Sequence, residues 1–484
     1  MTTVVPERIH GAVLPEPELE FFGGGRHIDI RFGLSDYGPL DAGSELAPKT
    51  VRVGLIGTPA TIEGAREWLE RCRDGIDASN SRQPNLHPGF PGFSPESPFR
   101  ATLAFDNTLE RPIAQREFIA LAKGGGVVEG AVELFMREMA HVVDKGAVDV
   151  FICALPPALL ELMGTPDATD PTDDSEIVPD EAPDFRRLLK ARAMRLRTPI
   201  QLVLPGTYAR SGRARTRFER ERQLQDEATR AWNFHTALYY KAGGTPWRLV
   251  RDSAALTTCY VGVSFYRSRD KATVSTSIAQ VFNELGEGII VRGAPAAVSK
   301  EDRQTHLSEA DARQLLIDAL GRYRQEHKTL PARVALYKTS LFDDAERVGL
   351  ESALDELGID SADLLAVGSG DAKLFRRGAY PPLRGTFVAL DERNLLLYTR
   401  GSVDFFRTYP GPYVPQPLAI RCDQTNRSPR ELAEEALALT KMNWNNTQFD
   451  GYWPITVRAA REVGNILKYL GATEPLEARY AYYM

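Results

Sequence analysis

Short apolar runs alternate with longer amphipathic stretches along the first half of this 484-residue chain. Apolar runs predict strands, and apolar residues at helical spacing predict helices. The predicted strands cover residues 51–57, 101–105, 148–155 and 199–204, and the predicted helices cover 62–72, 127–143 and 231–241. Strands that alternate with helices are typical of a parallel sheet with helices on both faces. The first half therefore predicts a Rossmann-like α/β layer.

The second half opens with strands and continues with alternating helices and strands. Its predicted strands cover 257–266, 275–282, 288–292, 333–338, 364–367, 386–390 and 395–399, and its predicted helices cover 308–326, 344–357, 429–440 and 455–470. Residues 275–282 and 288–292 form one expected hairpin, and residues 386–390 and 395–399 form another. This order predicts a second α/β domain that begins near Pro246.

Three segments show neither the helical spacing of apolar residues nor the apolar runs typical of strands. Residues 1–49 are rich in proline and glycine and predict an irregular arm that must pack on something else. The arm contains apolar side chains that need cover, namely Phe21, Phe22, Ile28, Ile30, Phe32 and Leu34. Residues 74–100 predict a surface loop because they contain five prolines, and the acidic, proline-rich residues 165–184 predict a solvated insertion.

Length and charge set limits on the class of protein. A chain of 484 residues exceeds one ordinary core, so two or three domains are expected. The formal net charge of −6 argues against a wholly basic nucleic-acid binder but allows a local basic groove. The four cysteines have no C-x-x-C spacing, and no apolar run is long enough to span a membrane. We therefore expect a cytoplasmic protein without disulfides or a zinc site.

The end of the helix predicted over 231–241 carries the first candidate chemistry. Lys241 lies in the last turn, and Gly243-Gly244 and Pro246 end the helix. A lysine there is ordinarily only a complement to the helix dipole. However, residues 208–222 just upstream hold six arginines, which favour a phosphate pocket over a solvated helix face.

Four stretches, in order along the chain, resemble Argonaute proteins. The segment from Asn233 through Lys241-Ala-Gly-Gly to Pro-Trp-Arg-Leu resembles the junction of the MID and PIWI domains. The other three stretches are residues 16–26 (EPELEFFGGGR) with 33–39 (GLSDYGP), then 439–445 (LTKMNWN), then 454–461 (PITVRAAR). The chain length is similar to that of the short prokaryotic branch, which lacks the N and PAZ domains.

This resemblance implies a domain layout and a binding site. It implies an N-terminal arm (1–49), a Rossmann-like MID domain that binds the 5′ end of a guide (50–245), and an RNase H-like PIWI domain (246–484). Lys241 would grip the guide 5′ phosphate, and the other implied phosphate contacts are Tyr208, Arg213 or Arg215, and Gln223 or Gln225. The family also uses its C-terminal carboxylate, here that of Met484, to hold Mg²⁺ on the guide phosphates.

The residues that cut nucleic acid in active relatives are replaced. In the family, one catalytic aspartate follows Gly-Val on the first strand and another lies on a later strand; the corresponding residues here are Ser264 and Thr339. A hydroxyl cannot neutralise two divalent ions as carboxylates do, so nuclease activity should be lost. An active guided endonuclease would need a relocated carboxylate set such as Asp252, Asp270, Glu287 and Asp371.

The resemblance therefore implies a guide-binding protein that does not cut. Relatives of this kind use guide RNA to recognise invading plasmid or phage DNA and form a heterodimer with an APAZ protein that carries a TIR, sirtuin-like or nuclease effector. A metabolic α/β enzyme is the remaining alternative. Gly124-Gly125-Gly126 precedes a predicted helix, but the G-x-G-x-x-G spacing of a dinucleotide loop is absent.

Overall fold

The structure, a computed structural model, describes residues 10–163, 183–209, 225–250, 256–269, 273–282, 288–290, 293–374, 382–409, 414–448, 451–471, 474 and 476–484. The chain divides into two compact units. The parallel-sheet unit contains Leu19–Arg248, Trp444–Thr447 and Asn465–Met484. The mixed-sheet unit contains Met1–Glu18, Leu249–Asn443 and Gln448–Gly464.

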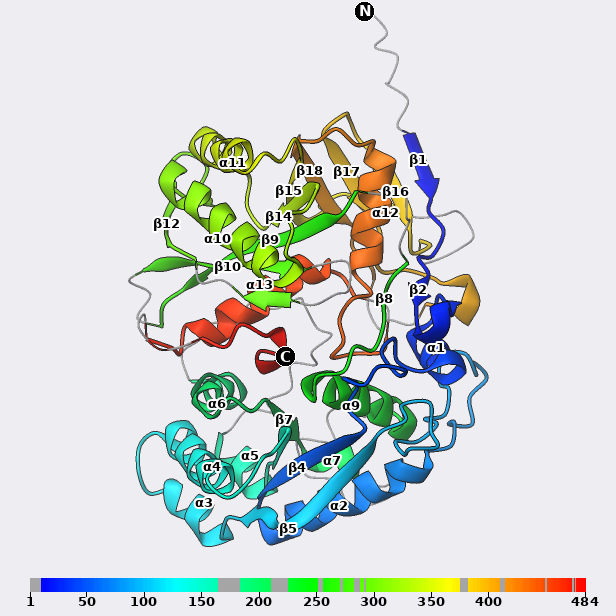
Figure 1. The fold of residues 1–484 in the computed structure, drawn as a ribbon, viewed down its shortest axis with the longest axis vertical. Helices are drawn as coiled ribbons and strands as arrows, with labels where there is room; N and C mark the ends of the chain where they lie inside the picture. The colour runs from blue at the N-terminus through cyan, green and yellow to red at the C-terminus, as the bar shows by residue number, and fades with distance from the viewer. Residues whose placement is uncertain are drawn as a thin grey trace, which may run out of the picture. The chain divides into compact units, whose positions relative to one another are not determined.

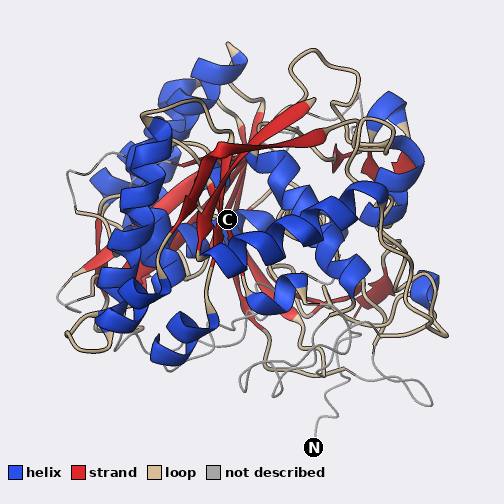
Figure 2. Cartoon of the chain, turned by 90° about the horizontal axis from the view of Figure 1, so that it is seen from below, coloured by secondary structure: helices blue, strands red, loops and turns tan. Residues whose placement is uncertain are grey.

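The parallel-sheet unit is built around four parallel strands in the order β5-β4-β6-β7. These are β4 (Thr50–Gly57), β5 (Thr102–Pro112), β6 (Val150–Ala154) and β7 (Ile200–Val203). Every residue of β6 is buried, as expected for a parallel strand covered on both faces. Figures 1 and 2 show helices packed around this sheet. The predicted Rossmann-like layer is confirmed.

The helices of this unit contact the sheet as two groups. The first group contains α3 (Gln115–Leu121), α4 (Val127–Val143), α5 (Pro157–Met163) and α6 (Phe185–Ala193), and the second contains α2 (Pro59–Asp74), α7 (Pro205–Tyr208) and α9 (Glu227–Lys241). The predicted bounds of α4 agree with the structure, and α9 ends at Lys241 as predicted. The sequence analysis missed α6 because arginine and lysine residues interrupt its apolar positions.

The prediction of an irregular arm is wrong in two respects. Residues 30–37 form the helix α1 (Ile30–Tyr37), whose first backbone amides donate to the Asp29 side chain. Two short strands, β2 (Leu19–Glu20) and β3 (Arg26–His27), flank the 3-10 turn η1 (Phe22–Gly24) and pair with each other. Short polar caps and turns define these elements. Because such caps and turns leave little periodic pattern in the sequence, the sequence analysis did not detect the elements.

The arm also covers its own apolar side chains within this unit. Phe21, Ile30 and Leu34 are buried. Arg31 and Asp29 form a buried ion pair at 3.0 Å, and Arg31 Nη1 donates to the Leu86 carbonyl oxygen at 2.8 Å. The arm and the proline-rich loop therefore hold each other in place.

The mixed-sheet unit contains an 11-stranded sheet in the order β1-β16-β17-β18-β15-β14-β9-β10-β12-β13, with β11 paired to β10. Its strands are β1 (His10–Val13), β9 (Thr258–Arg267), β10 (Val274–Phe282), β11 (Gly288–Ile290), β12 (Pro295–Val298), β13 (Thr305–His306), β14 (Arg333–Lys338), β15 (Ser361–Ser369), β16 (Thr386–Ala389), β17 (Asn394–Leu397) and β18 (Leu418–Gln424). Strand β14 runs parallel to β9 and β15, whereas the other pairs are antiparallel. Both predicted hairpins are present, β10 with β11 and β16 with β17.

Two helices close one face of this sheet. Helices α10 (Glu309–His327) and α11 (Asp344–Leu357) pack on β9, β14 and β15 through a core of buried apolar residues. Helix α12 (Pro429–Leu439) and residues 455–464 of α13 (Ile455–Leu467) also belong to this unit, and Thr456 of α13 packs against Gly262. A Cβ on Gly262 would lie 2.1 Å from the Thr456 carbonyl oxygen, so only glycine permits this close approach. The predicted RNase H-like architecture is confirmed.

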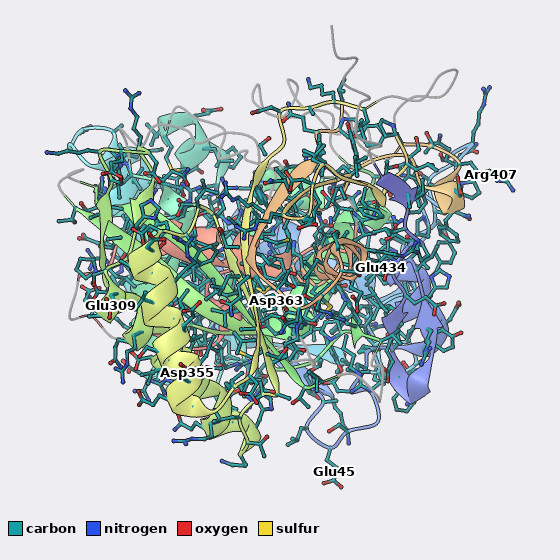
Figure 3. The ribbon with its side chains drawn as sticks, turned by 90° about the horizontal axis from the view of Figure 1, so that it is seen from above. Glu45, Glu309, Asp355, Asp363, Arg407 and Glu434 are labelled. Carbon is teal, nitrogen blue, oxygen red and sulfur yellow. The ribbon has the colours of Figure 1, made fainter. Side chains whose placement is uncertain are left out.

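A cluster of charged and phenolic groups is buried inside the mixed-sheet unit. Arg333 of β14 pairs with Asp363 of β15 and with Glu435 of α12, and all three side chains are at most 9% exposed. Figure 3 shows Asp363 in the interior, whereas Glu309 and Asp355 lie on the outer helices. The core of this unit is therefore held by ionic as well as apolar contacts.

Two general features complete the fold. The four cysteines are buried and free. Among the residues that the structure describes, no helix is both long and apolar enough to cross a membrane.

Candidate functional site

The C-terminal end of α9 is shaped by two glycines. Gly243 has a φ of +103°, a conformation that glycine adopts at little cost. The Gly244 amide donates to the Tyr239 carbonyl oxygen at 3.0 Å, and a Cβ on Gly244 would lie 2.1 Å from the Tyr239 ring. The two glycines thus end α9 directly after Lys241 and let the chain fold back against the helix.

Lys241 is buried beside the parallel sheet. Its side chain is on the last turn of α9, the residue is 3% exposed, and Nζ donates to Gln201 Oε1 on β7. A buried ammonium group needs polar and anionic partners. The contact with Gln201 orients the ammonium group.

Asp41 holds the turn that follows Lys241. Its carboxylate accepts a hydrogen bond from the Tyr239 hydroxyl at 2.8 Å and another from the Thr245 amide at 2.9 Å. Burial raises the pKa of Asp41, although both hydrogen bonds oppose this shift. The Leu40 amide also donates to the Pro246 carbonyl oxygen at 3.0 Å. The N-terminal arm thus positions the glycine turn, a role that the sequence analysis did not assign.

Two further cationic side chains lie on segments that contact the C-terminal turn η4 (Tyr480–Tyr482), which packs against α9 (Figure 1). Lys190 of α6 is 5% exposed, and its Nζ donates to the Tyr483 carbonyl oxygen at 3.2 Å. Arg479 is exposed, and its Nη2 lies 4.0 Å from the Cβ position of Gly243. Met484 itself is 1% exposed. Lys190, Lys241 and Arg479 therefore come from three segments gathered around one turn.

The other residues expected to contact the phosphate are placed differently. Gln225 lies before α9, and its Oε1 accepts a hydrogen bond from Asn233 Nδ2 at 3.4 Å. The Tyr208 ring lies against α2, because a Cβ on Gly64 would be 2.6 Å from it. The remaining expected residues, Gln223, Arg213 and Arg215, lie outside the described residues. Among the described residues, Gln201 is a glutamine that contacts Lys241, and sequence spacing from Lys241 could not identify it.

Asn233, which carries part of the sequence resemblance, has a structural role within this unit. Its Oδ1 accepts hydrogen bonds from the Thr447 amide at 3.0 Å and from the Thr447 hydroxyl at 2.9 Å. Thr447 is fully buried. Asn233 thus fastens residues 444–447 to α9.

In the mixed-sheet unit, Ser264 lies within β9, and Thr339 directly follows the neighbouring parallel strand β14. The Thr339 amide donates to the Val263 carbonyl oxygen at 3.2 Å, directly before Ser264. Val263 faces the core formed with α10 and α11, so the alternation along β9 turns Ser264 to the face on which α13 packs at Gly262. The structure therefore places on neighbouring strands the two positions at which the sequence resemblance implies carboxylates.

One cluster of potential metal ligands was found among the described residues, and it lies elsewhere. His306, Asp343 and Glu346 have ligand atoms within 4.8 Å of one another. However, the buried Lys338 ammonium already contacts Glu346, and His306 bridges Glu346 at 3.1 Å and Asp302 at 2.8 Å. Burial lowers the pKa of His306, but the hydrogen bonds to both carboxylates outweigh it and raise the pKa. Because the Lys338 ammonium group and the His306 ring already occupy these carboxylates, the cluster is a poor metal site.

The relocated carboxylate set cannot be assembled from the described residues. Asp252, Asp270 and Glu287 lie outside them, and Asp371 is exposed after β15.

The whole chain is similar in fold to solved Argonaute structures. Clostridium butyricum Argonaute bound to a guide DNA and a 19-mer target DNA matches 96% of this chain and 53% of its own, with 15% identity and a TM-score of 0.61. A. aeolicus Argonaute matches 98% of this chain and 54% of its own, with 16% identity and a TM-score of 0.57. Drosophila Piwi matches 98% of this chain and 56% of its own, with 13% identity and a TM-score of 0.60.

This chain spans about half the length of these structures. No protein-family model matches its sequence, and no curated protein does so either. At these identities the likeness establishes the fold alone. The chain therefore has a Rossmann-like layer and an RNase H-like unit arranged along the sequence as in the MID and PIWI regions of Argonaute proteins.

Proposed function

We propose that this protein binds the 5′-phosphorylated end of a guide strand at Lys241 and recognises a complementary strand by base pairing. The main support is that Lys241 is buried at the end of α9, where Gln201 orients its ammonium group. Arg479 lies beside the glycine turn that ends this helix. Charge-assisted hydrogen bonds from such groups suit a phosphate. The Clostridium butyricum structure, which holds guide and target DNA, supports this proposal through its similar fold.

The sequence resemblance to short prokaryotic Argonautes refines this proposal. It favours guide RNA as the bound strand, single-stranded plasmid or phage DNA as the target, and defence against invading DNA as the outcome. Pairing would read the target sequence while the protein holds the backbones, as in other guided systems.

We further propose that the protein has no nuclease activity. Ser264 and Thr339 supply hydroxyl groups where two divalent metal ions would need carboxylates. The cluster of Lys338, Glu346 and His306 is not a substitute, because the Lys338 ammonium group and the His306 ring occupy the Glu346 carboxylate.

We expect purified protein loaded with guide to leave complementary DNA and RNA uncut in Mg²⁺ or Mn²⁺. The measurement is denaturing electrophoresis of an end-labelled target, with the Ser264→Ala/Thr339→Ala variant as the matched control. A trace of contaminating nuclease would cut equally in both samples. A guide-directed product at one fixed position that disappears when a carboxylate of the mixed-sheet unit is replaced would establish the endonuclease alternative.

We propose Mg²⁺ only at the site that binds the 5′ end of the guide. The terminal carboxylate of Met484 would hold the ion, which would supply positive charge to the guide phosphates; carboxylate oxygens suit the preference of Mg²⁺ for oxygen ligands. The burial of Met484, which follows the turn η4 packed against α9, fits this placement. Lys190, which donates to the Tyr483 carbonyl oxygen, offers a second cation at the same turn.

An APAZ-containing effector protein is the proposed partner, as the resemblance implies. The apolar side chains of the arm do not support this partner, because Phe21, Ile30 and Leu34 are buried within the chain itself. The better support is strand β1, which lies at one end of the described sheet path and offers a strand edge for pairing.

We expect co-expression with the APAZ protein to give one heterodimer on size-exclusion chromatography. Obligate pairs bury roughly 2,000 Å² or more, so the complex should survive dilution. Replacing Val13 of β1, which is 51% exposed, with proline should lower the yield of complex per folded protein, because proline removes a backbone donor from the strand. Glu351→Ala, on the exposed surface of α11, should leave that yield unchanged. Separate monomers that bind full-length guide unaided would refute the heterodimer.

A further inference from the structure

Residues 38–44 of the N-terminal arm form a turn directly after α1, which we call the arm turn. Its backbone is closed by two hydrogen bonds. The Ala42 amide donates to the Pro39 carbonyl oxygen at 3.0 Å, and the Ser44 amide donates to the Asp41 carbonyl oxygen at 2.7 Å. Asp41 therefore lies inside a closed turn and belongs, like α9, to the parallel-sheet unit.

The arm turn is packed at both of its ends. A Cβ on Gly38 would lie 2.7 Å from the Pro98 carbonyl oxygen, so the proline-rich loop contacts the start of the turn. The Phe22 ring lies against Gly43, since a Cβ there would be 2.5 Å from the ring. These contacts fix the backbone on either side of Asp41, so its side chain is presented from a defined position.

The Asp41 carboxylate bridges the segment that carries Lys241. One oxygen accepts a hydrogen bond from the Tyr239 hydroxyl at 2.8 Å, and the other accepts one from the Thr245 amide at 2.9 Å. Tyr239 precedes Lys241, and Thr245 follows the glycine pair. We call this pair of hydrogen bonds the Asp41 clamp. Lys241 and both glycines lie between its two anchored residues.

The known bonds of the Asp41 side chain all go to this segment. Both partners are neutral, and no lysine or arginine among the described residues pairs with Asp41. The neighbouring Leu40 amide adds a third link of the arm turn, to the Pro246 carbonyl oxygen at 3.0 Å. The side chain therefore holds the end of α9 and does not serve in an ion pair elsewhere.

The segment needs such support because of its glycines. Gly243 and Gly244 have more backbone freedom than other residues, and Gly243 has a φ of +103°. A ligand that must order a loose segment on binding loses affinity, whereas a segment that is already held costs the ligand less. Fixing the residues on both sides of the glycine pair thus prepares the end of α9 for a ligand.

We infer that Asp41 is a positioning residue of the site that binds the guide 5′ phosphate. Through Tyr239 and Thr245 it would hold Lys241 and the glycine turn in place before the guide arrives. This inference rests on the proposed function and makes the N-terminal arm a part of its site. Asp41 itself would not touch the phosphate, because a carboxylate beside a phosphate repels it.

The test measures the ratio of affinities for 5′-phosphorylated and 5′-hydroxyl RNA guides of one sequence, by fluorescence anisotropy with the full chain. Asp41→Ala removes both hydrogen bonds of the clamp, so the ratio should fall about three- to tenfold, while affinity for the 5′-hydroxyl guide changes little. A role of Asp41 through its charge alone predicts the opposite sign, since removing a negative charge near a phosphate would raise the ratio. An unchanged or higher ratio would overturn the inference.

Asp41→Asn tests whether geometry or charge matters. The asparagine oxygen can accept from the Thr245 amide, and its NH₂ group can donate to the Tyr239 hydroxyl, which also accepts hydrogen bonds. The clamp is then kept without the charge, and the ratio should stay within about twofold of the wild-type value. A loss as large as that of Asp41→Ala would assign the effect to charge and contradict a positioning role.

Tyr239→Phe removes only one hydroxyl and keeps the ring against Gly244, so it provides a milder variant that should remain folded. We expect the ratio to fall about two- to threefold, because one hydrogen bond of the clamp is lost. Adding Tyr239→Phe to Asp41→Ala should cause no further loss, since the alanine variant has already broken the same bond. A further loss of equal size in the double variant would show that the two residues act independently.

Asp149→Ala is the matched control for general destabilisation. Asp149 Oδ2 accepts a hydrogen bond from the Arg52 amide at 2.7 Å in the same unit, so this variant also loses a link between a carboxylate and a backbone amide. Its melting temperature should fall while the ratio stays at the wild-type value. An equal fall of the ratio in Asp149→Ala and Asp41→Ala would reduce the effect to lost stability and overturn the inference.

The outcomes separate this inference from the function on which it rests. If the wild type binds both guides equally, the proposed function fails and the inference fails with it. If the wild type prefers the 5′ phosphate but Asp41→Ala and Tyr239→Phe keep the full ratio, only the inference fails.

Discussion

Replacement of Lys241 with methionine should remove most of the preference for a 5′-phosphorylated guide over a 5′-hydroxyl guide. The lost charge-assisted hydrogen bonds are worth about 1.5–3 kcal/mol, which is roughly a ten- to hundredfold change in affinity. Methionine keeps most of the side-chain volume at this buried position and removes only the charge. Lys241→Glu should have a larger effect because it places a negative charge beside the phosphate.

Fluorescence anisotropy with the two guides measures this preference directly. Lys145→Met, at an exposed position of the same unit, is the matched control and should keep the full preference. Gln201→Ala should weaken the preference less than Lys241→Met, because Gln201 orients the ammonium group without supplying charge. Equal binding of both guides by the wild-type protein would show that Lys241 does not bind a terminal phosphate.

The same titration tests Mg²⁺ at the guide end. If Mg²⁺ lies between the guide phosphates and the Met484 carboxylate, EDTA should weaken binding of the 5′-phosphorylated guide. A short Gly-Ser extension after Met484 should remove that cation dependence, because it moves the carboxylate. Cation-independent binding in both proteins would assign the role to Lys190 and Arg479, which already lie at this turn.

Much of the fold could be predicted because local signals were strong. Strands β4 and β6 are nearly continuous apolar runs, as buried parallel strands must be. The end of α9 was marked by a glycine pair, and the structure shows why: a side chain at Gly244 would collide with Tyr239. Elements defined by polar contacts were missed instead. Helix α1 depends on its Asp29 cap, and α6 is dominated by cationic residues.

The candidate site could be predicted only in part, because its members are distant in sequence. Lys241 was identified from its position at a helix end, but its contact Gln201 lies 40 residues earlier on β7. Asp41 and Arg479 approach the same turn from opposite ends of the chain. Neither has a spacing relation to Lys241 that a single sequence could reveal. Only the folded parallel-sheet unit brings them together.

Replacement of Arg333 with leucine should destabilise the mixed-sheet unit by about 3–5 kcal/mol, since breaking a buried ion pair leaves charge without a partner. Arg333 Nε donates to Asp363 at 2.6 Å, and Nη1 and Nη2 donate to Glu435 at 2.6 and 3.0 Å. Without the guanidinium group, the buried Asp363 would lose its ion pair and Glu435 would keep only the partly exposed Arg427, at 3.3 Å. The hydroxyls of Tyr260 and Tyr337, which donate to Glu435 at 3.2 and 3.1 Å, cannot replace the lost charge.

Chemical denaturation of wild type and variants measures the effect. The matched control is Arg313→Leu, which breaks an ion pair with Glu356 in the same unit. The two side chains are 39% and 50% exposed, so the loss of unfolding free energy should be about 0–1 kcal/mol. A variant that replaces Arg333, Asp363 and Glu435 together with apolar residues should recover much of the loss, because buried ion networks are costly to desolvate. This recovery distinguishes the effect of uncompensated charge from the effect of lost packing. If the triple variant is less stable than Arg333→Leu, the network stabilises the core mainly through its shape and hydrogen bonds. An Arg333→Leu protein as stable as the Arg313→Leu control would show that the cluster is not held together by charge.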